Sequence, residues 1–244
     1  MLENWNRVII AGKPADVFDP PGRPRFALLD LHPHTGPFVA GNALFTSLFA
    51  HQGLAVLCPH GGESWWTNRL CASFDLVQSA EDYLLHHAMP FIHERWGLSS
   101  PAVALTGIGM GGQGALCLAF KHPRLFPVVA AIAPAVEFHE RYGRGSPLDE
   151  MYTSKEQARQ DTAILQLHPA HQPPHLFFCV DPWDREWWRG SDRLHEKLNA
   201  LGVPHEADLT TRAGGHSPAY FEAMAERAVR FAVAGLAEQA KRLM

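Results

Sequence analysis

The chain has 244 residues, of which 46% are hydrophobic and 19% charged, and its formal net charge is -4. This length and composition suit one large α/β domain over residues 1–244 and argue against disorder. A slightly acidic chain without a basic patch has no electrostatic basis for binding nucleic acid or an anionic membrane, and we expect neither partner.

The first residues, Met1 to Arg7, lack the basic region and apolar run of a signal peptide. No apolar stretch approaches the ~20 residues of a membrane span. The cysteines show no CxxC spacing, which favours free buried thiols at Cys58, Cys71, Cys117 and Cys179. Together these features predict a cytoplasmic protein.

Short apolar runs alternate with longer helical patterns, which predicts a mostly parallel sheet flanked by helices. An N-terminal hairpin is expected from Arg7–Ile10 and Ala15–Phe18. Further strands are expected at Phe26–Leu31, Leu54–Cys58, Val103–Thr106, Val128–Ile132, Leu176–Val180 and Glu206–Leu209. Their continuous apolar character is typical of strands that are covered on both faces.

Helices are predicted between these strands, at Gly41–His51, Ser79–Arg95, Gly111–Lys121, Ser191–Leu201 and from Ser217 to about Leu236. Pro90 should kink or interrupt the second of them, because proline lacks the N–H that an inner helical turn requires. Ser217 followed by Pro218 is typical of an N-cap and a first-turn proline.

Residues 134–174 interrupt the alternation with many prolines and glycines and with short helical pieces near Lys155–Gln160 and Thr162–Leu167. A long insertion between two strands is where a lid or substrate-binding cap would lie. A surface excursion with no role explains the same pattern equally well.

Residues 103–116 read VALTGIGMGGQGAL. They have the strand–glycine–helix frame of a nucleophile elbow, G-x-S-x-G, with Gly107 and Gly111 at the two glycine positions. The position between them, which carries the nucleophilic hydroxyl in that motif, is Gly109. The segment therefore predicts a hydrolase fold and argues against ordinary hydrolase chemistry.

An acid and a histidine follow the elbow along the chain, as they do in α/β-hydrolases. The next strand leads into Asp181 and Asp184, and the strand after it leads into His216. Both loops lie at carboxyl ends of strands, where open α/β sheets bind ligands. We predict His216 as the base and favour Asp184 as its acid partner, because Asp181 abuts the strand and precedes a proline. Asp184 would then hold the imidazole in one tautomer.

An oxyanion hole requires two backbone N–H donors. One is predicted at Met110, at the start of the helix after the elbow. The other belongs to the loop after Phe26–Leu31, and because Pro33 has no N–H, His34 or Thr35 must supply it.

With these residues the chain resembles the esterase D family of α/β-hydrolases, which includes S-formylglutathione hydrolases, feruloyl and other carbohydrate esterases, and mycolyltransferases. The resemblance runs from about residue 25 to 235. Its most specific parts are residues 107–116, similar to G-x-S-M-G-G-x-G-A-L, and residues 215–217, Gly-His-Ser. Residues 31–36 are similar to the family's LHG loop, and residues 61–65 are similar to its GG-x-S-W segment.

The resemblance implies an α/β-hydrolase fold with a serine nucleophile at position 109, His216 as base, an Asp near 184, and oxyanion donors at Met110 and near His34. The chain departs from the family pattern at three positions. Gly109 replaces the serine, Pro33 stands where glycine is frequent, and Pro218 stands where an aromatic residue is common. The first departure concerns catalysis itself, and the others concern local geometry.

Other residues could take over chemistry at this site. Ser64, Cys58 and Cys117 are alternative nucleophiles. A zinc site is a further alternative, with ligands drawn from His32, His34, His60, Glu63, Asp184 and His216, although no pair has a tight ligand spacing. We expect neither a metal nor a cofactor.

Ser64 and Trp65 are candidate substrate contacts, and an aromatic-rimmed cleft would suit a sugar or aryl ester, although the tryptophans could equally pack the loops.

Two function hypotheses follow. The first is an esterase D-like carboxylic-ester hydrolase scaffold of the Ser-His-Asp type that lacks its serine, and is inactive or very weak. The second is a non-catalytic protein that binds a small ester, carbohydrate-like ligand or acid in the former acyl cleft. Both imply a small-molecule partner.

Overall fold

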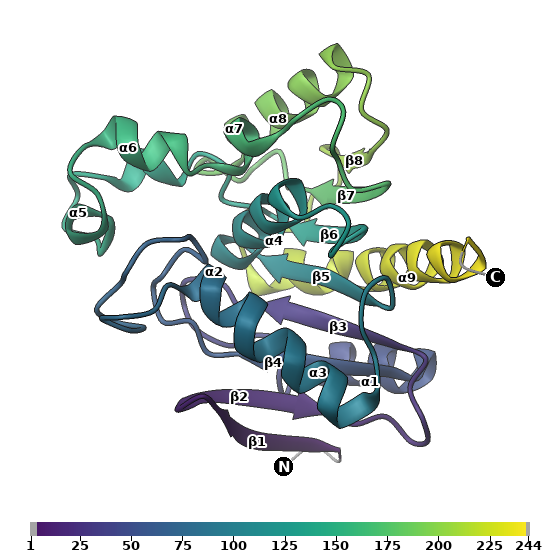
Figure 1. The fold of residues 1–244 in the computed structure, drawn as a ribbon. Coiled ribbons are helices and arrows are strands. Elements are labelled where there is room, and N and C mark those ends of the chain that lie inside the picture. The colour runs from purple at the N-terminus through teal and green to yellow at the C-terminus, as the bar shows by residue number, and fades with distance from the viewer. Residues whose placement is uncertain (1–3, 243–244) are drawn as a thin grey trace.

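The computed structural model describes residues 4–242, and one eight-stranded sheet runs through them (Figure 1). The strands are β1 (Trp5–Ile10), β2 (Lys13–Phe18), β3 (Phe26–Leu31), β4 (Leu54–Pro59), β5 (Val103–Ile108), β6 (Val128–Ile132), β7 (His175–Cys179) and β8 (Glu206–Asp208). Their order in the sheet is β1-β2-β4-β3-β5-β6-β7-β8. The β1–β2 hairpin and the β2–β4 pair are antiparallel, and all other neighbours are parallel.

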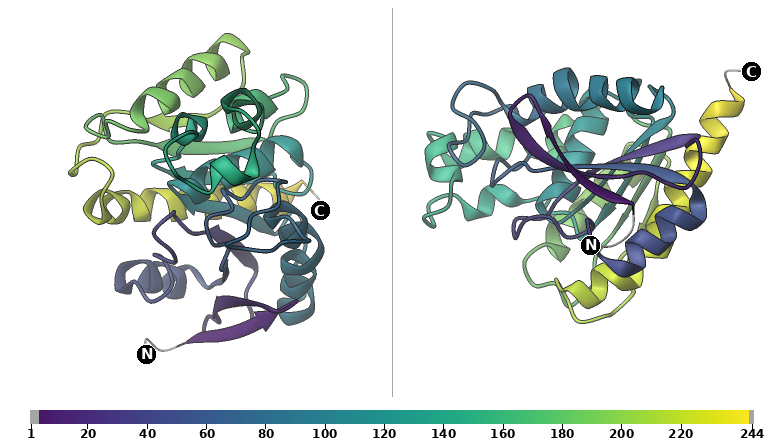
Figure 2. Two further views of the ribbon diagram at one scale, coloured as in Figure 1. Left: turned by 90° about the vertical axis from the view of Figure 1, so that its left-hand side faces the viewer. Right: turned by 90° about the horizontal axis from the view of Figure 1, so that it is seen from below.

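Helices cover both faces of this sheet, as the right-hand view of Figure 2 shows. On one face lie α1 (Ala43–Gln52) and α9 (Pro218–Lys241), and on the other lie α2 (Ala80–Tyr83), α3 (Met89–Trp96), α4 (Met110–Lys121) and α8 (Trp188–Ala200). Alternate residues of one strand enter different cores, so that Leu28 packs toward α1 and α9 while Leu29 packs toward the other helices. This double coverage explains why the strands are apolar at nearly every position.

The predicted strands and the main predicted helices are confirmed, with ends that shift by a few residues. Pro90 does not end its helix. A single π-helical turn at Leu84–Ala88 joins α2 to α3, so the chain stays helical up to and past the proline, whose missing N–H removes one regular helical bond. The last helix begins at Pro218, capped by the Ser217 side chain as predicted, and continues to Lys241, beyond the expected end near residue 236.

The insertion at residues 134–174 is also present. It contains a 3-10 turn at Phe138–Arg141 and the short helices α5 (Leu148–Met151), α6 (Lys155–Gln160) and α7 (Ala163–Gln166). Figure 1 places α5 and α6 beyond the carboxyl ends of the central strands. The insertion therefore lies at the edge of the sheet where ligands bind in this kind of architecture.

The four cysteines are free and buried, as predicted. Among the described residues, no helix has both the length and the apolar character needed to cross a membrane. That the chain forms one domain stays a prediction.

Candidate active site

The turn at Gly109 connects β5 directly to α4. Its φ of 57° and ψ of -113° lie outside the regions that residues with a side chain readily adopt. The Gly109 N–H donates to the Ile132 carbonyl at 3.0 Å, and the Gly109 carbonyl accepts from the N–H groups of Gln113 at 3.0 Å and Ala135 at 2.9 Å. Backbone hydrogen bonds to β6, to the segment after it and to α4 thus hold this turn in place.

The two flanking glycines are required for a different reason, which is close backbone approach. A Cβ at Gly111 would lie 1.7 Å from the Leu31 carbonyl oxygen, and a Cβ at Gly107 would lie 2.4 Å from the Gly111 backbone. Neither position has room for any side chain. The absence of side chains lets α4 begin against the end of β3, and this contact brings the loop after β3 next to Gly109.

His216 and Asp184 come from the loops after β8 and β7, and they form a hydrogen-bonded pair. His216 Nδ1 lies 2.9 Å from Asp184 Oδ2, and the Asp184 side chain is only 1% exposed. The other carboxylate oxygen, Oδ1, accepts from the backbone N–H groups of Glu186 at 3.1 Å and Trp187 at 2.9 Å. An ionised carboxylate only accepts hydrogen bonds, so in the neutral imidazole the proton resides on Nδ1 and the lone pair is on Nε2.

This imidazole faces the Gly109 turn. A Cβ added to Gly109 would lie 3.3 Å from both His216 Cε1 and Nε2, and 3.6 Å from Pro33 Cβ. Phe221 packs against the imidazole edge-on, with ring centroids 5.0 Å apart. The structure therefore brings Gly109, Asp184 and His216 together, and their catalytic roles stay predictions.

Asp181, the alternative acid, lies elsewhere in the loop. Its fully buried carboxylate accepts backbone N–H groups from Trp183 at 2.7 Å, Ala213 at 2.6 Å and Gly215 at 2.8 Å. Burial raises the pKa of Asp181, but these backbone donors outweigh burial and hold the pKa below its usual value. Asp181 thus ties the histidine loop to the loop after β7, a role that reasoning from the sequence missed.

The loop after β3 lies beside the same turn. Pro33 packs next to Gly109, His34 is half-buried with Nε2 3.6 Å from Glu63 Oε1, and Thr35 is exposed. Met110 is the first residue of α4, so its N–H is among those that lack a partner within the helix. Both loop and helix start are near the Gly109 turn, and the oxyanion-hole roles of Met110 and His34 stay predictions.

His32 anchors this loop through both ring nitrogens. Nε2 accepts the Gly61 N–H at 2.8 Å, so Nδ1 carries the proton and donates to the Pro33 carbonyl at 2.7 Å. Burial lowers the pKa of His32 to about 4, which keeps the ring neutral. A metal could bind His32 only by breaking one of these bonds.

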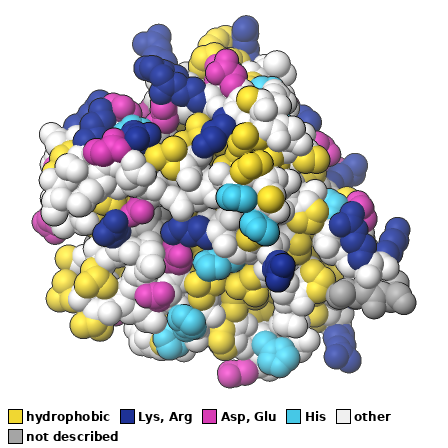
Figure 3. All heavy atoms as spheres, turned by 45° about the horizontal axis from the view of Figure 1, so that its top comes forward, with side chains coloured by type: hydrophobic (Ala, Val, Ile, Leu, Met, Phe, Trp, Pro, Cys, Tyr) yellow, Lys and Arg dark blue, Asp and Glu magenta, His cyan; other side chains and the backbone are white. Residues whose placement is uncertain are grey.

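The zinc alternative finds no support in the arrangement of the other histidines. Among residues 4–242, no group of three or more His, Cys, Asp or Glu side chains is placed to hold a metal ion. His60 instead pairs with Asp16 at 2.7 Å. Figure 3 shows one face of the molecule, on which histidine side chains lie among apolar and charged side chains.

The alternative nucleophiles are all buried. Ser64 is 0% exposed, and its hydroxyl oxygen accepts the Trp66 N–H at 3.3 Å. Burial raises the pKa of Cys117 to about 12 and that of Cys58 well above its usual value, so neither thiol is ionised near neutral pH. None of the three has the accessibility or the activation that a nucleophile needs.

Trp65 packs in the core rather than at a rim. Its ring stacks on Phe138 at a centroid distance of 5.1 Å and meets His34 at 5.8 Å and Trp187 at 6.3 Å. Trp183, at 60%, is the exposed tryptophan in this region. The interpretation that large aromatics pack the loops therefore accounts for Trp65, and substrate contact by Trp65 or Ser64 stays a prediction.

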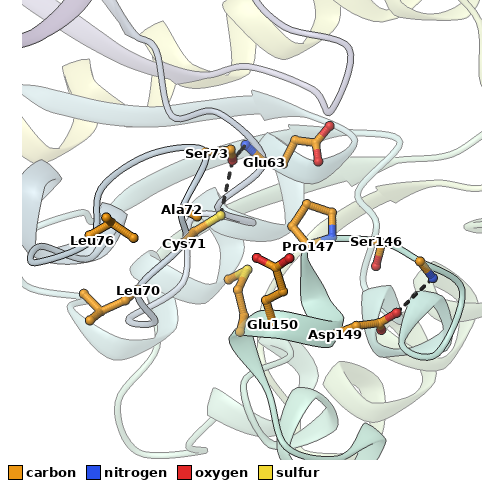
Figure 4. A pocket seen from close by; sticks show the side chains of 12 residues that line it. Glu63, Leu70, Cys71, Ala72, Ser73, Leu76, Ser146, Pro147, Asp149 and Glu150 are labelled. Carbon is orange, nitrogen blue, oxygen red and sulfur yellow. Dashed lines mark hydrogen bonds between the residues drawn. The ribbon is translucent and has the colours of Figure 1, made fainter.

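A cavity of about 710 Å³ lies between the loop at residues 63–76 and the insertion (Figure 4). Glu63, Cys71 and Ser73 line one side, and Pro147 and Glu150 line the other. Neither Gly109 nor His216 borders it. Glu63, the residue paired with His34, connects this cavity to the loop beside the Gly109 turn.

A mostly parallel sheet with helices on both faces, a glycine turn between its central strand and helix, and an Asp–His pair on later loops define an α/β-hydrolase. The chain belongs to the esterase family described as "Putative esterase", whose model matches residues 42–232. No curated protein matches the sequence.

Solved structures share this fold. A ferulic acid esterase is 14% identical with a TM-score of 0.75, covering 95% of this chain and 97% of its own. An S-formylglutathione hydrolase from Agrobacterium tumefaciens is 16% identical with a TM-score of 0.74, covering 95% and 94%. An S-formylglutathione hydrolase from Staphylococcus aureus is 18% identical with a TM-score of 0.74, covering 94% and 99%. At these identities the likeness establishes the fold.

Proposed function

We propose that this protein is a carboxylic-ester hydrolase scaffold of the esterase D type that lacks its serine nucleophile. One observation carries the proposal. The Nε2 atom of His216, held by buried Asp184, faces a position where Gly109 offers a Cα and no hydroxyl. The ligand is a small ester or a carbohydrate-like molecule, reached from the edge of the sheet that the insertion borders.

The missing hydroxyl removes covalent acyl transfer, because no oxygen is present for the histidine to deprotonate. In well-studied triads, loss of the nucleophile lowers turnover by about a million-fold and leaves ~10³–10⁴-fold over the reaction in water. Ester hydrolysis through an acyl-protein intermediate is therefore absent, and any ester hydrolysis that remains is very weak. Retention of the full Asp–His geometry favours this proposal over a site rebuilt for binding alone.

The substitution Gly109→Ser tests it, with Gly109→Ala as the matched control. Both variants place a Cβ in the tight space beside His216 at a positive φ, and both should lose about 1–3 kcal/mol of stability. Only serine adds a hydroxyl within reach of Nε2. We expect Gly109→Ser to hydrolyse 4-nitrophenyl acetate with a burst and an acylated protein visible by mass spectrometry, and Gly109→Ala to do neither.

A folded but silent Gly109→Ser protein would contradict the proposal. It would favour the alternative, a non-catalytic protein that binds its ligand in the former acyl cleft. Folding is checked by circular dichroism on both variants, so that loss of structure is not mistaken for loss of chemistry.

A further inference from the structure

We infer that the site transfers an acyl group directly from an activated ester to a small hydroxyl compound, water or a short alcohol, which occupies the space of the missing side chain. The inference rests on the proposed function, since it requires that the cleft accept an ester. It goes beyond that function because it assigns an activity to the protein with Gly109 in place, and the reaction passes through no acyl-protein intermediate.

The first support is a base whose lone pair is free. Asp184 fixes the His216 proton on Nδ1, so Nε2 is the acceptor atom. Across residues 4–242, the structure gives Nε2 no hydrogen-bond partner. Asp184 is itself held by two backbone N–H groups, so the imidazole does not have to reorganise before it accepts a proton.

The second support is a loop that holds this base still. Asp181 accepts the N–H groups of Ala213 and Gly215, the residues just before His216. Phe221 packs against the edge of the ring. A base held at a fixed position can act on a bound molecule whose own position is set by the walls of the site.

The third support is the size of the space in front of Nε2. A Cβ at Gly109 would lie 3.6 Å from Pro33 Cβ and 3.3 Å from the imidazole, so these two groups closely bound the space beside the turn on two sides. We expect water or methanol to fit between these walls and a branched alcohol to be excluded. The His216 side chain is 31% exposed, so small molecules reach the gap from solvent.

In the reaction, the hydroxyl oxygen attacks the ester carbonyl carbon while Nε2 takes its proton. The new C–O bond forms, and the carbonyl π electrons move onto oxygen. When that oxygen re-forms the carbonyl, the bond to the leaving alkoxide or phenolate breaks and the Nε2 proton passes to the leaving group. The histidine returns to its neutral state, and the products are an acid or a new ester together with the released alcohol.

The experiment measures 4-nitrophenol release from 4-nitrophenyl acetate by the unaltered protein as methanol is added, with tert-butanol as the bulky comparison. We expect release to rise in proportion to methanol, with methyl acetate as product, and to be unchanged by tert-butanol. General-base catalysis by a positioned histidine contributes roughly 10²–10⁴-fold, so His216→Ala should lower the protein-dependent rate about 100-fold or more. The exposed His51→Ala variant is the control for adventitious imidazole catalysis and should match the unaltered protein.

Asp184→Asn supplies an independent readout. An asparagine amide can donate to Nδ1, which moves the ring proton to Nε2 and blocks proton acceptance. We expect this variant to lose the methanol-dependent rate while staying folded.

Equal rates in the unaltered protein and His216→Ala, an equal response to both alcohols, or an acetyl group on His216 would each overturn the inference. The last result would mean that the imidazole attacks the ester itself. These failures are separable from failure of the proposed function, because Gly109→Ser would still be an active esterase in each case.

Discussion

Asp30 is a buried carboxyl group on β3, one residue before the strand end that Gly111 approaches. The Thr106 hydroxyl on β5 donates to it at 2.7 Å, and the Cys58 thiol on β4 lies at 4.0 Å. Burial raises the pKa of Asp30 from 3.8 to about 6, against the opposing effect of the Thr106 hydrogen bond. Ionisation of the buried Asp30 carboxyl at neutral pH thus lowers the free energy of unfolding.

That cost should appear in the pH dependence of stability. The stabilisation that the protonated Asp30 carboxyl gives to the folded protein is fully present below pH 3.8. It is lost as the pH rises through about 6. The pKa difference is equivalent to about 3 kcal/mol at 1.36 kcal/mol per pKa unit. In urea unfolding at pH 4 and pH 7.5, Asp30→Asn should therefore lose less stability on going to the higher pH, by up to about 3 kcal/mol.

The exposed change Glu196→Gln serves as control for the loss of one negative charge and should keep the pH dependence of the unaltered protein. If Asp30→Asn also keeps it, Asp30 is ionised in the folded protein at both pH values and the expected cost is absent.

At the scale of secondary-structure elements, the insertion is tied to the body by a few specific contacts. Arg69 Nε, from the loop after β4, donates to Asp161 Oδ2 at 2.8 Å, and its guanidinium lies over the Tyr152 ring at 5.4 Å. Gln113 Oε1, on α4, accepts the Ala163 N–H at 2.9 Å. The Arg69 contacts tie the insertion to the loop after β4, and the Gln113 contact ties α7 to the helix that begins at the Gly109 turn.

Arg69→Ala should loosen the insertion without unfolding the molecule. Partly exposed ion pairs are worth about 1 kcal/mol or less, so global stability should change little. Amide hydrogen exchange over residues 152–163 should become several-fold faster, because local opening depends on these contacts.

Arg159→Ala is the matched control, since Arg159 pairs with Glu156 inside the same short helix and ties the insertion to nothing else through that pair. Equal exchange rates in the two variants would show that the Arg69 contacts do not anchor the insertion.

At the scale of the whole molecule, the sheet and the central helix meet most closely at Gly111. A Cβ there would lie 1.7 Å from the Leu31 carbonyl oxygen, and backbone atoms on both sides have no rotamer through which to move away. We expect Gly111→Ala to separate the layers and to lower the free energy of unfolding by more than about 3 kcal/mol, at the extreme of single substitutions.

Thermal unfolding measures this effect, with soluble yield as the readout if the variant does not fold. Gly143→Ala, at an open surface position with φ of 81°, is the comparison and should cost only about 1 kcal/mol. A Gly111→Ala protein that melts like Gly143→Ala would contradict the close approach of the layers.

The architecture was predictable because the strands are buried on both faces and so appear as continuous apolar runs, as at Phe26–Leu31 and Val128–Ile132. The order of Gly109, Asp184 and His216 along the chain also follows from the fold type. Beyond these three residues, contacts between distant segments were not predictable. Nothing local in the sequence indicates that Asp181 binds the histidine loop.

The burial of loop residues could not be predicted from the sequence either. Ser64 and Trp65 lie in a connection between strand and helix, where exposure is the usual expectation, yet both are buried, and Trp65 stacks on Phe138 of the insertion. The Trp65 stacking partner, Phe138, comes much later in the chain.

The glycine at position 109, beside His216, also has an evolutionary consequence. Glycine codons of the GGT and GGC type become serine codons by one base change, so a gene using such a codon at position 109 lies a single mutation from regaining a hydroxyl there. Under the proposed function, Asp184 and His216 would already stand beside that hydroxyl, and such a mutant would not need to assemble a catalytic site step by step. Under the same proposal, a population carrying this gene would keep an esterase within one mutation of selection.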